Sequence, residues 1–311
     1  MTASPVAAAP APAGPVSFGP ITFIPGKKGG RYPYCHSLVV SQGTETWVVD
    51  PAADKAYFQE LARTRQVTGV FLSHFHEDHQ KYNYLFPGAR FYGPLLEAAA
   101  FASMEGVFRL MGITDPQFRD YWQRTLTRDF HFRPLADFTP YFPGQLFQLG
   151  DVVLEIIPLP GHTPGHSGFH FRRQELLYLA DVDLTPFGPW YGDAASDLEA
   201  FAATLEGLEL FQARTYITAH EQGIFTPEAF RAGLADYRHM LTRRETRLLA
   251  SLDTPQSLAR LTARRLIYGK AKEPLFVYDH MESQMVAKHL DRLRRQGRVT
   301  RTPDGLWQRK L

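Results

Sequence analysis

The chain has 311 residues, of which 44% are hydrophobic and 21% are charged, a globular balance that excludes both wholesale disorder and a fibrous repeat. A chain of this length can bury a large core, and we expect roughly two domains. The single cysteine, Cys35, excludes an intramolecular disulfide framework and indicates a reducing compartment. The apolar runs are too short for a spanning helix, so we expect no membrane partner.

The composition of the first sixteen residues indicates whether they form a signal peptide or a disordered tail. Residues 1–16 are rich in Ala and Pro and contain no Lys or Arg. A signal peptide needs a positive start and an unbroken apolar stretch, whereas prolines interrupt this one. We therefore interpret 1–16 as a disordered tail and expect a cytoplasmic protein.

Charge is distributed unevenly along the chain. Residues 241–311 hold 16 Lys or Arg against 7 Asp or Glu, whereas the other 240 residues hold 18 against 25. Such asymmetry is typical of an end that faces nucleic acid. The alternative, which we favour, is a basic module docked on an acidic one. Either way the asymmetry predicts a domain boundary near 230–240, which we place between 235 and 236.

The predicted elements begin with short β-branched and aromatic runs separated by Gly-containing turns, followed by one amphipathic helix over 54–65. We expect strands over 21–24, 37–40, 46–49 and 67–73. Residues 95–143 then combine helical spacing of large apolar side chains with a Pro/Phe-rich stretch. We interpret 95–143 as a helical, aromatic-rich insertion, which packs its own core and could also form a lid or dimer surface beside an apolar pocket.

Strand patterns resume over 152–158, 176–179 and 215–218, and Ser196–Glu199 has the spacing of a capping box that opens a helix towards Leu210. After residue 240 the pattern of predicted elements changes from alternating strands and helices to helices followed by a hairpin. The sequence predicts helices over 241–251, from Thr254-Pro255 and over 282–296, and then a hairpin over 298–309. Three helices and a hairpin are typical of a winged helix, so we expect a winged-helix-like domain over 236–311.

One segment is dense in side chains that bind metals. FLSHFHEDHQ supplies His74, His76, Asp78 and His79 within six residues, on the loop that leaves a predicted buried strand. Imidazole and carboxylate are the ligands that borderline divalent metals such as zinc prefer. A cluster this dense is costly unless a cation neutralises it, so we interpret it as a metal site.

Three further residues repeat this arrangement. His162, Asp181 and His220 each lie just past the end of a predicted strand, in LPGHTPGHS, LYLAD and TYITAH. Loops that leave one edge of a sheet carry function on a rigid scaffold. We therefore expect four strand ends to converge on one site.

This motif series resembles that of the metallo-β-lactamase superfamily: HFHEDH at 74–79, GHTPGH at 161–166, LAD at 179–181 and AHE at 219–221, with Asp50 in WVVDPAA as the family's early Asp. The resemblance covers roughly residues 17–225. It implies an α+β fold, an αββα sandwich with the metal site at one edge of two sheets, in a catalytic domain that we place at 17–235.

The resemblance also implies roles for these residues. His74, His76 and His162 would bind one metal, Asp78, His79 and His220 a second, and Asp181 would bridge them. Asp50 would orient the motif loop through hydrogen bonds. His166 is a supporting residue in the family pattern and stays outside the metal set. We expect two divalent ions, zinc first, with iron or manganese as alternatives.

A pair of such metals lowers the pKa of bound water towards neutrality, which implies attack by metal-bound hydroxide on a carbonyl or phosphoryl centre. Asp78 is the residue we expect to orient that nucleophile. Asp181 stands where the best-known group of zinc β-lactamases has Cys. Leu184 stands where quorum-signal lactonases usually carry Tyr. The sequence most resembles a glyoxalase II-like subgroup with an appended C-terminal winged helix.

Three functions stay open, and no residue is assigned to substrate binding. We favour hydrolysis of a small ester, thioester or lactone, because the aromatic insertion suits a partly apolar substrate; the basic module would then cap the active site or form a homodimer. The first alternative is an endoribonuclease in which five basic side chains contact phosphates: Lys288, Arg292, Arg294, Arg295 and Arg298. The second is a persulfide dioxygenase with mononuclear iron. A DNA-binding regulator is disfavoured by the intact metal set.

Overall fold

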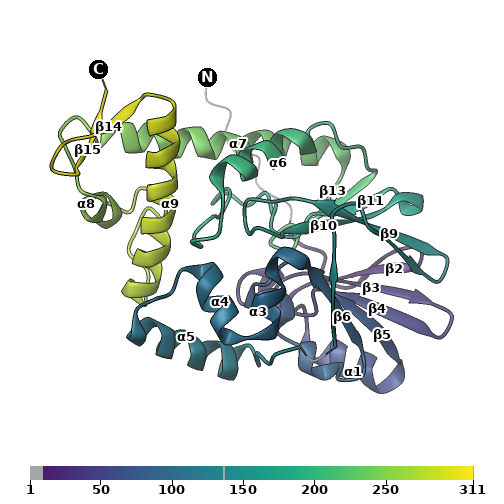
Figure 1. Ribbon diagram of the computed structural model, residues 1–311. Helices are drawn as coiled ribbons and strands as arrows, with labels where there is room; N and C mark the ends of the chain where they lie inside the picture. Colours follow the sequence, from purple (N-terminus) through teal and green to yellow (C-terminus); the bar gives the residue numbers. More distant parts are fainter. Residues whose placement is uncertain (1–9, 136, 311) are drawn as a thin grey trace.

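The computed structural model of the protein describes residues 10–135 and 137–310. Two β-sheets face each other, and helices cover the outer face of each (Figure 1). Residues 1–9 of the tail expected over 1–16 lie outside the described residues, and residues 10–15 contain neither helix nor strand.

The first sheet has seven strands that neighbour one another in chain order. They are β1 (Val16–Phe18), β2 (Ile21–Ile24), β3 (Ser37–Gln42), β4 (Glu45–Val49), β5 (Val67–Phe71), β6 (Arg90–Pro94) and β7 (Phe138–Tyr141). The strands from β1 to β4 are antiparallel, whereas those from β4 to β7 are parallel. The loops that follow β4 and β5 therefore leave the sheet at the same edge.

The second sheet has six strands in the order β13-β12-β11-β10-β9-β8. Their bounds are β8 (Leu146–Leu149), β9 (Val152–Pro158), β10 (Ser167–Phe171), β11 (Leu176–Tyr178), β12 (Thr215–Ile217) and β13 (Ile224–Phe225). Strands β11 and β12 are parallel neighbours, so the loops after them also emerge together.

The alternation of apolar side chains along the strands builds three cores. On β3, Leu38 and Val40 lie between the sheets, while Val39 faces the helices outside. The outer face of the first sheet is covered by α1 (Lys55–Thr64), α3 (Ala98–Ala102), α4 (Met104–Met111) and α5 (Pro116–Asp129). The outer face of the second sheet is covered by α6 (Leu198–Leu208) and α7 (Pro227–Ala250). The expected αββα sandwich is confirmed.

The segment 95–143 is only partly the insertion that we expected. Its first part forms α3, α4 and α5, but its Pro/Phe-rich end forms β7, which extends the first sheet beyond β6. Phe138 pairs with Phe91, and the hydroxyl of Tyr141 donates to the Leu72 carbonyl at 2.8 Å. Those contacts make this end an integral edge of the sheet.

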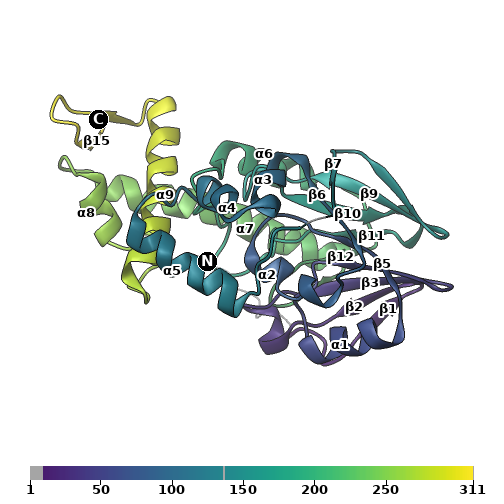
Figure 2. The same ribbon diagram turned by 60° about the horizontal axis from the view of Figure 1, so that its bottom comes forward.

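The C-terminal part follows the expected order of helices and hairpin, with different bounds. The predicted helix 241–251 is the second half of α7, and the predicted boundary at 235/236 falls inside that helix. After Pro227, no proline interrupts this stretch, so the change in charge does not end the helix. Then follow α8 (Leu258–Ala263), α9 (Leu275–Arg295), β14 (Val299–Arg301) and β15 (Trp307–Arg309). We call residues 236–311 the C-terminal module (Figure 2).

The module packs against both helical layers. The ring of Phe276 on α9 lies 5.5 Å from that of Phe118 on α5, and the His280 ring donates to the Met111 carbonyl of α4 at 3.2 Å. Leu290 and Leu293 on the same helix join the core under α7. Among the described residues, no helix is long and apolar enough to cross a membrane.

Candidate metal centre

All seven side chains predicted as metal ligands lie at the edge where β5, β9, β11 and β12 end, beside the end of β4. They form two groups, in each of which the donor atoms lie within 4.8 Å of one another. The first group is His74, His76, His162 and Asp181, and the second is Asp78, His79 and His220.

Three imidazole nitrogens of the first group converge on one point. His76 Nδ1 lies 3.0 Å from His74 Nε2 and 3.0 Å from His162 Nε2, and the latter two atoms are 3.3 Å apart. All three rings are buried. Lone pairs packed this closely repel one another unless a proton or a cation sits between them, so the donor set fits a borderline divalent metal.

Asp181 connects the two groups. Its Oδ2 lies 3.3 Å from His162 Nε2, while its Oδ1 lies 2.9 Å from His79 Nε2 and 3.4 Å from His220 Nε2. His79 Nε2 and Asp181 Oδ1 are both buried, and neither has a hydrogen-bond partner of good geometry among the described residues. Buried orphaned atoms of this kind are the ones a bound cation would satisfy.

The far nitrogen of each ring is held by an acceptor behind the site. His76 Nε2 donates to Asp193 Oδ2 at 2.7 Å, His162 Nδ1 donates to the Trp190 carbonyl at 2.9 Å, and His220 Nδ1 donates to the Gly30 carbonyl at 2.5 Å. Such partners fix the orientation of each ring, so that the near nitrogen faces the site and can bind a metal once it is deprotonated.

Asp50 lies behind the second group, as the resemblance implies. Its Oδ1 accepts from the Ser73 amide at 2.8 Å, and its Oδ2 accepts from Ser73 Oγ, His79 Nδ1 and the Tyr178 hydroxyl at 2.6 to 2.8 Å. Its backbone has a φ of +46°, a conformation that Asp tolerates better than most residues. This carboxylate orients His79 and the start of the histidine loop.

His166 stays outside both groups. Its Nδ1 donates to the Leu159 carbonyl at 2.8 Å, and its Nε2 accepts from the backbone amide of Asp181 at 3.1 Å. With both nitrogens used, this ring has no atom left for a metal, and it fixes the backbone that carries Asp181.

Glycine lets the loop at 161–166 approach α6. Gly161 has a φ of +127°, and a Cβ there would lie 2.3 Å from the backbone of Phe201. The helix that the loop approaches is capped by Asp197, and not by Ser196 as the sequence suggested, and it ends at Leu208. Ser196 instead donates from Oγ to the His162 carbonyl at 2.7 Å.

The histidines of the centre differ in protonation state, because burial lowers their pKa values and nearby carboxylates raise them. Burial lowers the pKa of His74 and of His162 well below the usual range, so both rings are neutral. Burial also lowers the pKa of His76 and His220, but Asp193 and Asp181 outweigh it and raise these values to about 9 and about 10. Burial likewise opposes ionisation of Asp181, yet the neighbouring histidines hold its pKa well below the usual range.

Two supporting carboxylates were missed by the sequence reasoning. Asp193 holds His76, as described above. Glu97 is fully buried, accepts from the Phe75 amide through Oε2 at 2.7 Å, and accepts from the Gly165 amide and Thr163 Oγ1 through Oε1. It therefore ties the loop at 74–79 to the loop at 161–166. The signal for Glu97 was a lone carboxylate in the apolar run LLEAAAFA; Asp193 had no comparable signal.

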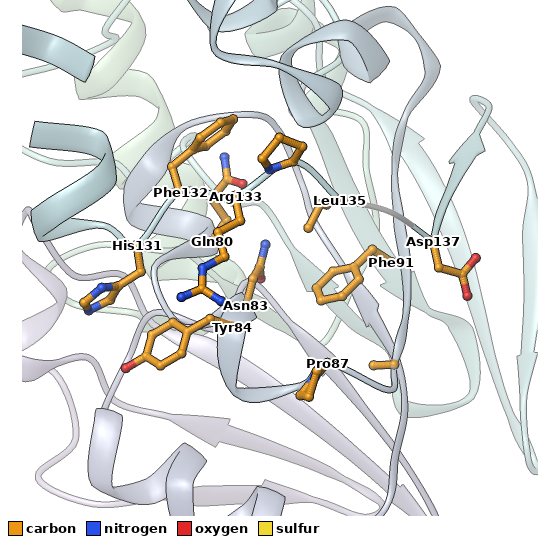
Figure 3. A pocket seen from close by; sticks show the side chains of 12 residues that line it. Gln80, Asn83, Tyr84, Pro87, Phe91, His131, Phe132, Arg133, Leu135 and Asp137 are labelled. Carbon is orange, nitrogen blue, oxygen red and sulfur yellow. The ribbon is translucent and has the colours of Figure 1, made fainter. Parts of the chain in front are cut away.

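A separate cavity is lined by Gln80, the last residue of α2 (Glu77–Gln80), the short helix that also carries two of the clustered residues (Figure 3). Its volume is about 220 Å³, and Gln80, Asn83, His131 and Arg133 are among its lining residues. None of the seven clustered side chains lines it, so this cavity is distinct from the metal centre.

Comparison with known proteins agrees with this geometry. The family model described as the metallo-beta-lactamase superfamily matches residues 31–220. A metallo-beta-lactamase family protein from Thermus thermophilus has a similar fold, with a TM-score of 0.70 and 22% identity over 94% of this chain and 99% of that one.

Two curated relatives are enzymes. A hydroxyacylglutathione hydrolase from Rhizobium johnstonii is 28% identical over 136 residues, which span 42% of this chain and only 40% of that protein. An atrochrysone carboxyl ACP thioesterase from Paecilomyces divaricatus is 24% identical over 255 residues, or 78% of this chain and 68% of that protein.

Proposed function

Because this chain belongs to the metallo-β-lactamase superfamily, we propose that it is a hydrolase whose seven clustered side chains bind two divalent metal ions, with zinc as the metal. We propose a small acyl thioester as the substrate, with esters and lactones as related classes. Its superfamily and its His/Asp site support the general class, and the specific metal and substrate are our proposal.

The observation that carries the proposal of two metals is the orientation of Asp181. One carboxylate oxygen faces the first group and the other faces the second, as a bridging ligand requires. A mononuclear iron site, as in the persulfide dioxygenase alternative, would need only one of these groups. The presence of both groups therefore favours hydrolysis.

The residues around the centre have separable roles. When bound, two such metals polarise a carbonyl and lower the pKa of water towards neutrality. Asp78 Oδ2 lies 3.7 Å from His220 Nε2, and we propose that this carboxylate would accept a hydrogen bond from the attacking water and take its proton. Asp181 and the histidines hold the reacting centre in place, and Asp50, Asp193 and Glu97 hold those ligands.

Support for a thioester comes from the relatives and from the side chains beside the centre. Both relatives have names that denote hydrolysis of an acyl group carried on sulfur, either of glutathione or of an ACP. In this chain the Trp190 ring lies 5.5 Å from the His76 ring and 5.4 Å from the His162 ring. Trp190 is half-buried, whereas its neighbour Tyr191 is fully enclosed. We propose that Trp190 contacts the acyl group.

The contacts of the basic side chains favour a docked module over the endoribonuclease alternative. Of the five basic side chains proposed to guide RNA, Arg292 and Arg295 pair with Glu199 on α6, and Arg298 pairs with Glu245 on α7. The other two are also engaged, since Lys288 donates to the Asp193 carbonyl and Arg294 lies 3.6 Å from Asp291. These contacts favour the interpretation of a basic module docked on acidic partners.

The test compares substrates and variants in one preparation. We expect zinc-loaded protein to release thiol from a hydroxyacylglutathione or an acyl-pantetheine, at a rate about 100-fold above that of Asp78→Ala. A lactone and a labelled single-stranded RNA are assayed in parallel. Cleavage of RNA alone, lost in Asp78→Ala, would overturn the thioester proposal in favour of the ribonuclease. If Asp78→Ala kept the full activity of the wild-type chain, the proposed mechanism would be overturned.

A further inference from the structure

One loop orients two of the three histidines of the first group. Residues 187–193, between β11 and α6, supply the Asp193 carboxylate to His76 Nε2 and the Trp190 carbonyl to His162 Nδ1. Both bonds fix which nitrogen of the ring faces the site. The orientation of the His76 and His162 rings therefore depends on how rigidly the 187–193 loop is held in place.

The C-terminal module holds this loop along its length. Arg244, buried on α7, donates to the carbonyls of Phe187 and Pro189 at 2.6 and 2.5 Å. The Tyr191 hydroxyl lies 2.6 Å from His289 Nε2 on α9, and Trp190 Nε1 donates to the hydroxyl of Tyr268 at 3.0 Å. The loop thus has contacts to three separate parts of the module.

Lys288 makes the contact nearest to the centre. It lies half-buried on α9, and its Nζ donates to the Asp193 carbonyl at 2.6 Å. The same residue, Asp193, reaches His76 with its carboxylate at 2.7 Å. Fixing the backbone of Asp193 fixes the point from which that carboxylate extends. Two hydrogen bonds, one to the backbone and one to the side chain of Asp193, therefore connect α9 to the first group.

We infer that Lys288 is a positioning residue of the metal centre, acting through Asp193 on His76, and that the C-terminal module is a structural part of that centre. This inference rests on the proposed function, because it requires the first group to bind a metal. On this inference the C-terminal module has a structural role that requires no nucleic acid. Lys288 restrains the 187–193 loop, which would lack these contacts in the catalytic domain alone.

The inference is tested by metal affinity in the full-length chain. Metal-free protein is titrated with zinc against a chromophoric chelator, and with Co²⁺ to record the ligand-field spectrum. We expect Lys288→Met to weaken zinc binding at one site about 10- to 100-fold, the usual effect of losing a group that orients a ligand. Lys288→Arg, which keeps a donor, is expected to recover most of the affinity. Arg294→Met is the matched control, because this exposed residue pairs only with Asp291 on its own helix.

A double-mutant cycle separates positioning from general loosening of the fold. If Lys288 acts through Asp193, then Lys288→Met changes the affinity little once Asp193→Ala is present. Full additivity of the two changes, or an unchanged zinc affinity and Co²⁺ spectrum in Lys288→Met, would overturn the inference. Failure of the wild-type chain to bind metal would instead overturn the proposed function, so the two failures are distinguishable. Thermal melts of the metal-free variants identify any that do not fold.

Discussion

His79 donates a hydrogen bond from Nδ1 to Oδ2 of Asp50 at 2.8 Å, and this bond turns its Nε2 towards Asp181. Asp50 directly follows β4, and His79 lies on α2 in the loop that leaves the parallel neighbour β5, so the pairing of these two strands brings the two residues to the same edge of the sheet. Orientation of the second group is thereby built into the sheet, whereas orientation of the first group depends on the 187–193 loop.

We expect Asp50→Ala to weaken zinc binding at the second group about 10- to 100-fold, because His79 loses the acceptor that fixes its tautomer. Tyr178→Phe is the matched control, since it removes another hydrogen bond to the same carboxylate and leaves His79 in place. Competition titration of both variants measures the difference. Equal losses in the two variants would show that the carboxylate acts only through packing.

Asp78→Ala is expected to abolish hydrolysis while the fold persists. Asp78 is on the short helix α2, and its carboxylate lies 3.7 Å from His220 Nε2 in the centre, so we expect its removal to leave the fold in place. The expected result is a loss of about 100-fold or more in kcat with an almost unchanged melting temperature. Turnover close to wild type in this variant would contradict a role for Asp78 in proton transfer.

The ligands could be predicted from sequence because each follows a strand and because His and Asp are dense there. The residues that orient them could not. Asp193 reaches His76 from a loop 117 positions away, and Glu97 joins two loops that meet only in the folded chain. Neither carboxylate has a local pattern, because its partners are set by the packing of the two sheets.

Several strands and the start of the C-terminal module were also not predicted correctly, again because they depend on packing in the folded chain. Strands β6, β7, β8, β10 and β13 were not predicted, because pairing with a neighbour in the folded sheet decides them more than their own sequence does. The predicted break before the C-terminal module followed a change of charge, but α7 continues through it, since helix continuation depends on backbone and side-chain packing and not on net charge.

Metal binding is expected to release protons. In the metal-free protein burial opposes protonation, but the carboxylates raise the pKa of His76 to about 9, that of His220 to about 10 and that of His79 well above its usual range, so all three rings are protonated at pH 7. A metal ligand must be neutral, so each ring gives up its proton, and affinity falls as the pH is lowered. Calorimetry at pH 7 in buffers of different ionisation enthalpy should count about three protons released from these rings per chain. Heats that do not depend on the buffer would contradict these protonation states.

The final prediction concerns Glu97, which accepts hydrogen bonds from both motif loops. Glu97→Gln replaces one acceptor oxygen by an NH₂ group that meets the Phe75 or Gly165 amide donor. One buried donor is then left without a partner, and we expect the free energy of unfolding to fall by about 1 to 3 kcal/mol. Denaturant melts of the metal-free protein measure it. Glu60→Gln is the control, because the Glu60 carboxylate forms an exposed pair with Arg63, and its loss should lower the free energy of unfolding far less. Equal effects of the two substitutions would show that Glu97 does not tie the loops together.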